Sequence, residues 1–94
     1  MPIYNVTYDL STPGGDYAGV EAAIKRSKAW LHMMQSTWLV ATDETAAEVY
    51  NRIAPKLRKC DLIFVNAVTN RYYGWLPPKT WEWIKAWLAA MAEV

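Results

Sequence analysis

Residues 29–42, AWLHMMQSTWLVAT, decide the fold of this chain. The segment contains two extended apolar stretches with only Gln35 and Ser36 between them, and this spacing predicts a β-hairpin. The two stretches span 29–34 and 37–42. On either side of the hairpin the sequence changes to helical periodicity, and beyond each helical segment lies one further extended segment. The chain is therefore expected to run strand, helix, hairpin, helix, strand.

The segment before the hairpin is predicted to form a strand and a helix. Residues 3–9 alternate, which is typical of a strand with one buried face. Turn-forming residues at 11–15 end this strand, and Asp16 occupies the position of a helix N-cap. An apolar stripe at three- and four-residue spacing from Tyr17 to Ser27 predicts the helix that follows.

The segment after the hairpin is predicted to form a helix and a strand. The stretch 45–48 has the spacing of a capping box, with Thr42 and Asp43 as competing N-caps. Pro55 should kink or end this helix, because proline lacks the amide donor that the preceding turn needs. Residues 61–68 are apolar on both faces, as expected of a strand that is covered on both sides.

A last helix is expected over about 78–92, because Pro77 and Pro78 suit a helix start and apolar residues recur after them. The preceding order of strand, helix, strand, strand, helix, strand is that of the ferredoxin-like βαββαβ unit. We therefore predict a single α+β domain over 1–94, with a four-stranded antiparallel sheet, two helices on one face and an extra C-terminal helix. The other face needs a cover, either this Trp-rich helix or a second subunit, and we expect a homodimer.

Composition limits the classes of function. A chain of 94 residues forms at most one compact domain, and its 53% hydrophobic content excludes disorder. The net charge of +1 excludes the broad basic field that would indicate nucleic-acid binding by composition alone. Cys60 is the single cysteine, which excludes a disulfide framework and predicts a cytoplasmic protein. No apolar run approaches the length of a membrane span, so no membrane partner is expected.

The sequence Tyr8-Asp9-Leu10-Ser11, at the end of the first predicted strand, is part of a family resemblance. With the predicted topology it resembles the small CRISPR-associated endonuclease of the adaptation complex and its relatives, which include the VapD toxin ribonucleases and the small "SinR family" proteins. The SinR family resembles the chain most closely. The matching residues are Tyr8-Asp9-Leu10, Pro13-Gly14, Asp16-Tyr17, Ser36-Thr37-Trp38-Leu39-Val40, Asp61 and Gly74-Trp75-Leu76-Pro77.

The resemblance to the CRISPR-associated relatives implies a catalytic and metal-binding role for Asp9. In those relatives the aspartate that ends the first strand binds Mg²⁺ together with its symmetry mate across a dimer, and the ion activates water at a phosphodiester. Mg²⁺ often takes only one or two protein carboxylates, so two copies of Asp9 would suffice. The alternative interpretation is that Asp9 is an ordinary turn residue that bonds to its own backbone. This chain also departs from those relatives, because it ends in an aromatic helix where they commonly exchange a C-terminal strand.

Most of the cations lie near the C-terminal parts of the first two predicted helices. They are Lys25, Arg26, Lys28, Arg52, Lys56, Arg58 and Lys59. Joined by Arg71, they would line a phosphate-binding surface for RNA or DNA. The alternative is that they only offset the helix macrodipoles.

Aromatic residues gather near the C-terminus. Exposed aromatic side chains stack on bases or anchor a protein partner. The candidates are Tyr72, Tyr73, Trp75 and Trp83, of which Trp83 lies between the positions of the helical stripe. The alternative is that most of these tryptophans cover the open face of the sheet.

Two functions remain as hypotheses. The first is a homodimeric nucleic-acid-binding protein that acts as a Mg²⁺-dependent endonuclease through Asp9. The second is a non-catalytic interaction module, phage- or defence-associated, that binds a protein or a small ligand through its dimer and its Trp-rich C-terminal segment.

Overall fold

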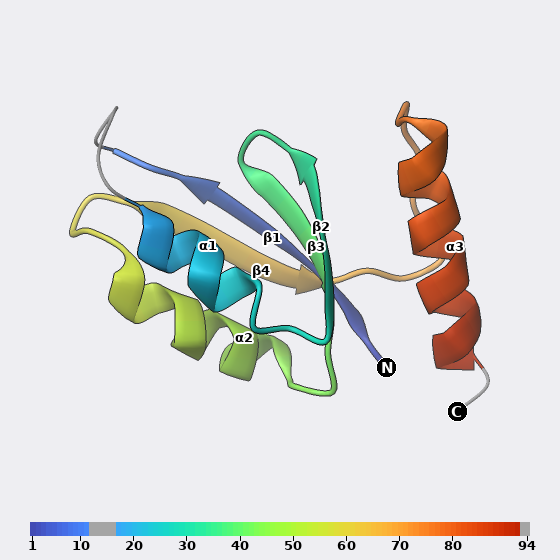
Figure 1. The fold of residues 1–94 in the computed structure, drawn as a ribbon, viewed down its shortest axis with the longest axis horizontal. Coiled ribbons are helices and arrows are strands. Elements are labelled where there is room, and N and C mark those ends of the chain that lie inside the picture. Colours follow the sequence, from blue (N-terminus) through green and yellow to red (C-terminus); the bar gives the residue numbers. More distant parts are fainter. Residues whose placement is uncertain (12–16, 93–94) are drawn as a thin grey trace.

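The order of helices and strands agrees with the order that the sequence predicts (Figure 1). The structure is a computed structural model and describes residues 1–11 and 17–92. Its elements are β1 Ile3–Asp9, α1 Ala18–Ile24, β2 Ala29–Met34, β3 Thr37–Ala41, α2 Ala46–Ile53, the 3₁₀ turn η1 Ala54–Lys56, β4 Leu62–Ala67 and α3 Pro78–Ala92. Most of the turn expected at 11–15, and the N-cap expected at Asp16, lie outside the described residues.

The four strands form one antiparallel sheet in the order β2-β3-β1-β4. The register places Val6 of β1 opposite Trp38 of β3 and Val65 of β4. The hairpin of β2 and β3 therefore forms one side of the sheet, β1 is a central strand between β3 and β4, and β4 forms the other edge. This arrangement confirms the predicted α+β class and its ferredoxin-like topology.

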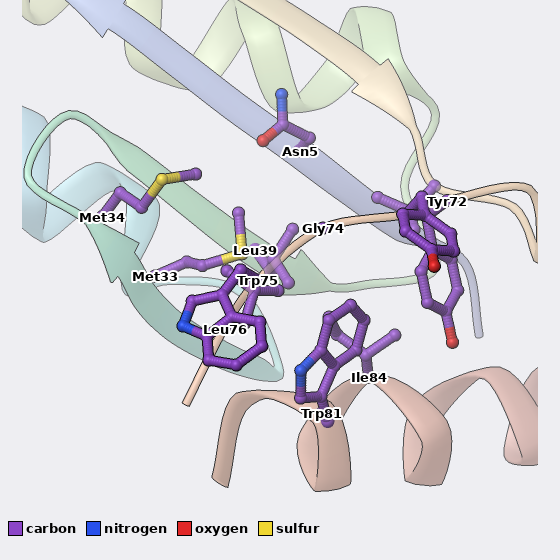
Figure 2. A pocket seen from close by; sticks show the side chains of 12 residues that line it. Asn5, Met33, Met34, Leu39, Tyr72, Gly74, Trp75, Leu76, Trp81 and Ile84 are labelled. Atoms are coloured by element: carbon purple, nitrogen blue, oxygen red, sulfur yellow. The ribbon is translucent and has the colours of Figure 1, made fainter. Parts of the chain in front are cut away.

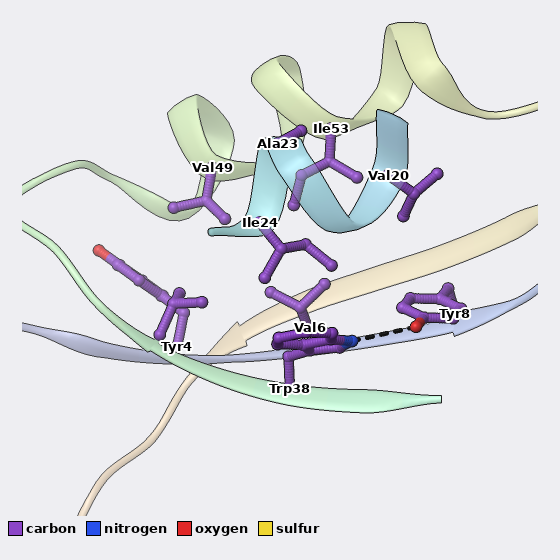
Figure 3. Packing of buried hydrophobic residues seen from close by; sticks show 10 residues of the cluster. Tyr4, Val6, Tyr8, Val20, Ala23, Ile24, Trp38, Val49 and Ile53 are labelled. Carbon is purple, nitrogen blue, oxygen red and sulfur yellow. Dashed lines mark hydrogen bonds between the residues drawn. The ribbon is translucent and has the colours of Figure 1, made fainter. Parts of the chain in front are cut away.

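One hydrophobic cluster fills the space between the sheet and the helices α1 and α2 (Figure 3). It forms because alternate residues of β1 share one face, and that face meets the apolar stripes of both helices. Its buried members are Tyr4, Val6, Tyr8, Val20, Ala23, Ile24, Trp38, Val40, Val49 and Ile53. Trp38 is the largest of these, and its Nε1–H donates a hydrogen bond to the hydroxyl of Tyr8 at 3.0 Å.

The start of α2 has the geometry that the sequence predicts. The backbone N–H of Glu48 donates to Thr45 Oγ1, and the backbone N–H of Thr45 donates to Glu48 Oε1, both at 3.1 Å. These reciprocal bonds form a capping box and make Thr45 the N-cap. Pro55 lies in the 3₁₀ turn that follows Ile53, so the predicted end of the helix at this proline is confirmed.

The last helix, α3, packs on the opposite face of the sheet through Ile84, which forms a second cluster with Ile3 and Leu39. In Figure 1 it stands apart from α1 and α2, beside the N-terminus. Trp83 is half-buried against this cluster and packs on Trp87, with ring centroids 6.1 Å apart, so the expectation that it lies outside the packing is wrong. No helix within 1–11 and 17–92 is long and apolar enough to cross a membrane.

The expectation that residues 61–68 are covered on both faces is wrong. β4 is an edge strand, and on its outer face Leu62 and Phe64 are 66% and 65% exposed. These side chains lie opposite Asp9 and Thr7 of β1, far along the strand from the end that α3 covers. The open face of the sheet is thus covered at one end and bare at the other.

Candidate functional site

A groove of about 390 Å³ lies between the open face of the sheet and the segment that joins β4 to α3 (Figure 2). Three strands, the helix α3 and the joining segment contribute its lining. The lining residues are Asn5 from β1, Met33 and Met34 from β2, Leu39 from β3, Trp81 and Ile84 from α3, and Val68, Tyr72, Tyr73, Gly74, Trp75 and Leu76 from the joining segment. We call this feature the aromatic groove.

The joining segment presents two aromatic side chains to solvent. Tyr73 and Trp75 are 103% and 98% exposed, so they make almost no contact with the rest of the protein. Tyr72 is held more firmly, because its ring stacks on Trp81 with centroids 5.6 Å apart and an angle of 26° between the planes. A fixed aromatic wall therefore continues into an exposed aromatic rim, which is the type of surface that anchors a ligand.

The floor of the aromatic groove is apolar apart from one amide. Leu39 and Ile84 are only 3% and 4% exposed and close the groove from below. Asn5 is the polar side chain of the floor, and its Nδ2 donates to Thr7 Oγ1 and to Asn66 Oδ1, both at 3.0 Å. None of the lining residues carries a charged side chain. An uncharged, largely apolar ligand suits such a lining.

The structure brings together three of the four aromatic residues expected to bind a partner. Tyr72, Tyr73 and Trp75 line the aromatic groove, whereas Trp83 packs against the sheet. The sequence interpretation missed Asn5 and the methionines of β2. Asn5 lies on the polar face of the alternating first strand, and that position was the one available signal for it.

Asp9 is exposed at the end of β1, on the same face of the sheet as Asn5. It borders a shallow depression of about 190 Å³ that Leu62 and Phe64 also line. No hydrogen bond to its carboxylate is present within 1–11 and 17–92, and most of the turn to which the alternative interpretation refers lies outside these ranges. The same ranges contain no group of three or more His, Cys, Asp or Glu side chains placed to hold a metal ion.

Asp61 joins the two chain segments that meet at this end of the sheet. Its Oδ1 accepts hydrogen bonds from the backbone N–H of Ser11 at 2.7 Å, from the Ser11 hydroxyl at 2.8 Å and from the Tyr17 hydroxyl at 3.0 Å. Its Oδ2 accepts from the backbone N–H of Arg58 at 2.7 Å. Desolvation alone would raise the pKa of Asp61, but these hydrogen bonds lower the pKa from its ordinary value of 3.8 to about 2.

Replacement of Asp61 by asparagine should lower the free energy of unfolding at neutral pH. The free energy of unfolding of the variant should also depend less on pH in the acid range. Because the folded-state pKa is lowered, the carboxylate contributes stability above pH 3.8 and loses it as the pH falls through about 2. Urea unfolding midpoints measured from pH 5 down to about pH 2 check this prediction. Asp43→Asn, at an exposed carboxylate, is the control. Equal acid slopes for wild type and Asp61→Asn would contradict it.

The structure does not gather the predicted phosphate-binding cations into one patch. Lys25, Arg26 and Lys28 follow the end of α1. Arg58 lies at the other end of α1, where its guanidinium carbon is 5.0 Å from the ring centroid of Tyr17. Lys56 is also at that end, since a Cβ on Gly19 would lie 3.4 Å from its Cδ. Lys59 follows Arg58 directly, and Arg71 lies in the joining segment after β4.

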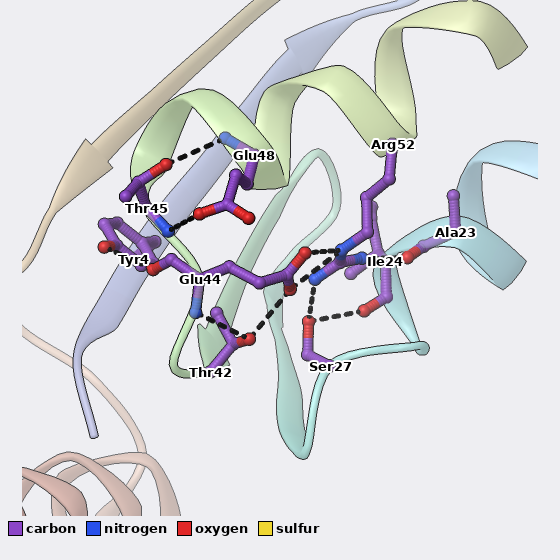
Figure 4. Close-up of polar contacts among 9 residues, drawn as sticks. All are labelled: Tyr4, Ala23, Ile24, Ser27, Thr42, Glu44, Thr45, Glu48 and Arg52. Atoms are coloured by element: carbon purple, nitrogen blue, oxygen red, sulfur yellow. Dashed lines mark hydrogen bonds and ion pairs between the residues drawn. The ribbon is translucent and has the colours of Figure 1, made fainter.

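Arg52 points inward rather than toward a ligand (Figure 4). Its Nε donates to the two carboxylate oxygens of Glu44 at 3.1 and 3.2 Å, and its terminal nitrogens donate to the carbonyl of Ala23 and the hydroxyl of Ser27. Only 11% of its side chain is exposed. The guanidinium thus ties the end of α1 to α2, and Arg52 does not belong with the exposed cations.

The open face of the sheet therefore carries two candidate sites, which lie one after the other along β1. The aromatic groove lies over Asn5, next to the end that α3 covers, and the depression beside Asp9 lies at the bare end. Comparisons with protein-family models, with curated proteins and with solved structures found no match to the chain.

Proposed function

We propose that this chain is a non-catalytic binding module that captures an uncharged apolar ligand or protein segment in its aromatic groove. The observation that carries the proposal is the near-complete exposure of Tyr73 and Trp75 at the rim of an uncharged groove. Large apolar side chains exposed together on one surface typically mark an interaction site. Covering about 200 Å² of an indole at roughly 25 cal/mol per Å² stabilises a complex by about 5 kcal/mol before the cost of association.

Trp75→Ala should weaken binding strongly without affecting the fold. Because Trp75 is 98% exposed, its loss should change the free energy of unfolding by less than about 0.5 kcal/mol. An anchoring tryptophan is worth about 2 kcal/mol or more in a complex, so affinity should fall by a factor of about 30. An NMR-detected screen of small fragments and short peptides, run on the wild type and the variant, measures the affinity, and urea unfolding measures the free energy of unfolding.

Phe64→Ala is the matched control for this screen. Phe64 is an exposed aromatic residue on the same face of the sheet but outside the aromatic groove. Ligands that shift groove resonances in the wild type and in Phe64→Ala, but not in Trp75→Ala, support the proposal. A screen in which no ligand shifts these resonances would refute it.

The bare end of the sheet favours a second function. We propose, as this second candidate, a homodimer in which another copy covers Leu62 and Phe64 and brings two Asp9 carboxylates to one Mg²⁺ ion for cleavage of RNA or DNA. The supporting observation is that Asp9 is exposed and flanked by exposed apolar side chains. Three cations, Lys56, Arg58 and Lys59, lie close to this end, just before the segment that pairs with β1. The resemblance carried by Tyr8-Asp9-Leu10 agrees with this arrangement.

Asp9→Asn should remove metal-dependent cleavage if this second function holds. Labelled single-stranded RNA, single-stranded DNA and duplex DNA are incubated with the wild type or the variant in Mg²⁺, Mn²⁺ or EDTA. Phosphate contacts predict binding that weakens steeply as the salt concentration rises. Asp43→Asn is the control, and Phe64→Glu should dissociate the dimer in light scattering. A wild type that is monomeric, and shows neither cleavage nor salt-sensitive binding, would exclude this candidate.

A further inference from the structure

We propose that the ligand of the aromatic groove is an uncharged, planar aromatic molecule that donates a hydrogen bond to the side-chain oxygen of Asn5. This inference rests on the proposed binding function and names the ligand class of the same site. It follows from the volume, the aromatic walls and the single side-chain amide of the groove.

The size of the aromatic groove suits a small molecule. Its volume of about 390 Å³ lies within the range of roughly 300–1,000 Å³ that is typical of small-molecule sites. An extended peptide would bring a backbone N–H and C=O with every residue, and each of these groups needs a partner when it is buried. The side-chain polar groups of the lining are the amide of Asn5, the hydroxyls of Tyr72 and Tyr73 and the indole N–H groups of Trp75 and Trp81. A ring system with a single polar group needs fewer partners from this lining than a peptide does.

The walls of the aromatic groove favour a flat ligand. Trp81 is fixed by its stacking on Tyr72, and the exposed Trp75 supplies a second indole (Figure 2). Aromatic rings attract one another in offset-stacked and edge-to-face arrangements beyond the effect of buried area alone. The thioethers of Met33 and Met34 make further favourable contacts with aromatic rings.

The polar requirement comes from Asn5. Within the described residues both hydrogen bonds of its side chain run from Nδ2, and its Oδ1 accepts none. A carbonyl oxygen that a ligand covers loses its hydration and needs a donor in return. A charged ligand would find no opposite charge in the lining. The ligand should therefore be neutral and carry an N–H or O–H group.

Three probes of similar size separate these requirements. 2-Naphthol is planar and has a donor, 2-methoxynaphthalene is planar without a donor, and decahydro-2-naphthol has a donor without a flat ring. NMR titration of the full chain follows the indole N–H signals of Trp75 and Trp81 and the amide of Asn5. We expect 2-naphthol to bind about fivefold more tightly than either of the other probes, because each of those lacks one favourable interaction.

Two variants test the assignment to Asn5. Asn5→Val suits a strand and removes the acceptor, so the affinity for 2-naphthol should fall to that for 2-methoxynaphthalene, and the latter should not change. Phe64→Ala should leave all three affinities unchanged. If Asn5→Val does not fold, the comparison of the three probes on the wild type still decides the question.

The outcomes distinguish this inference from the function on which it rests. Equal affinities for the three probes would overturn the ligand class and leave the binding function in place. If a decaproline peptide binds in a manner that depends on Trp75, and none of the three probes binds, the ligand class is likewise overturned and the binding function stays in place. If neither the probes nor any member of the fragment and peptide screen shifts the groove resonances, the inference and the proposed function both fail.

Discussion

Trp38→Ala is expected to lower the free energy of unfolding by about 4 kcal/mol, as typical for loss of a large buried aromatic side chain. Trp38 is only 1% exposed and lies opposite Val6 of β1 and His32 of β2, at the centre of the hairpin side of the sheet. Domains of this size have free energies of unfolding of about 5–15 kcal/mol. The variant should therefore keep only a fraction of the wild-type stability and unfold at a much lower urea concentration.

The loss is expected to be large because several side chains depend on Trp38. The imidazole of His32 stacks on it at 4.0 Å with an angle of 8° between the planes, and the ring of Trp30 lies 5.4 Å away. Lys25 Nζ lies 5.8 Å from its centroid and 4.8 Å from that of Trp30. The hydroxyl of Tyr8 would also lose its donor. Cavity formation and an unpaired buried hydroxyl thus add together.

Urea unfolding followed by far-ultraviolet circular dichroism measures this effect. Trp38→Phe is the informative companion, because it keeps an aromatic ring but loses the hydrogen bond to Tyr8 and part of the volume. We expect it to cost about 2 kcal/mol, between the wild type and the alanine variant. Trp75→Ala, at an exposed position, supplies the reference. A Trp38→Ala protein as stable as Trp75→Ala would show that the cluster under α1 and α2 does not determine stability.

The fold could be predicted from the sequence where one face of an element is buried and the other is not. The alternation in β1, the capping box at Thr45 and the proline pair at the start of α3 are local signals, and each agrees with the structure. The predicted coverage of both faces is wrong for the segment 61–68, because the sequence shows that a residue is apolar but not whether a neighbouring element covers it. Phe64 lies on an edge strand beyond the reach of α3, and no local pattern contains that information.

The candidate site was only partly predictable for the same reason. Tyr72, Tyr73 and Trp75 are close together in the sequence, which predicts them, with Trp83, as candidates for binding a partner. Asn5 and Met33 join them only through the pairing of strands and the packing of α3, which are long-range features. Side-chain direction is a second limit on prediction. The sequence shows that position 52 is an arginine, but it does not show whether the guanidinium faces a phosphate or a carboxylate of its own chain.

Arg52→Met is expected to destabilise the fold by about 2–3 kcal/mol, because methionine keeps the apolar stem and removes every donor. The carboxylate of Glu44, the carbonyl of Ala23 and the hydroxyl of Ser27 would lose a partner. The cost stays below that of a fully buried pair because 32% of the Glu44 side chain is exposed. Arg52→Lys should recover only part of the loss, since an ammonium group cannot reproduce the planar fork of donors.

A double-mutant cycle with Glu44→Gln separates the ion pair from the other bonds of Arg52. The charge-assisted hydrogen bond, in which Nε–H is shared between the two carboxylate oxygens, predicts a coupling energy of about 1–2 kcal/mol between the two side chains. The remaining loss in Arg52→Met belongs to the bonds that hold the end of α1, and Ser27→Ala should reproduce part of it. Strict additivity of Arg52→Met and Glu44→Gln would contradict the ion pair.

A measured coupling would show that the guanidinium of Arg52 stabilises the fold. Neutralising Arg52 in a variant that remains folded should then leave any salt-sensitive binding of RNA or DNA unchanged. Loss of Lys56, Arg58 or Lys59 should weaken that binding.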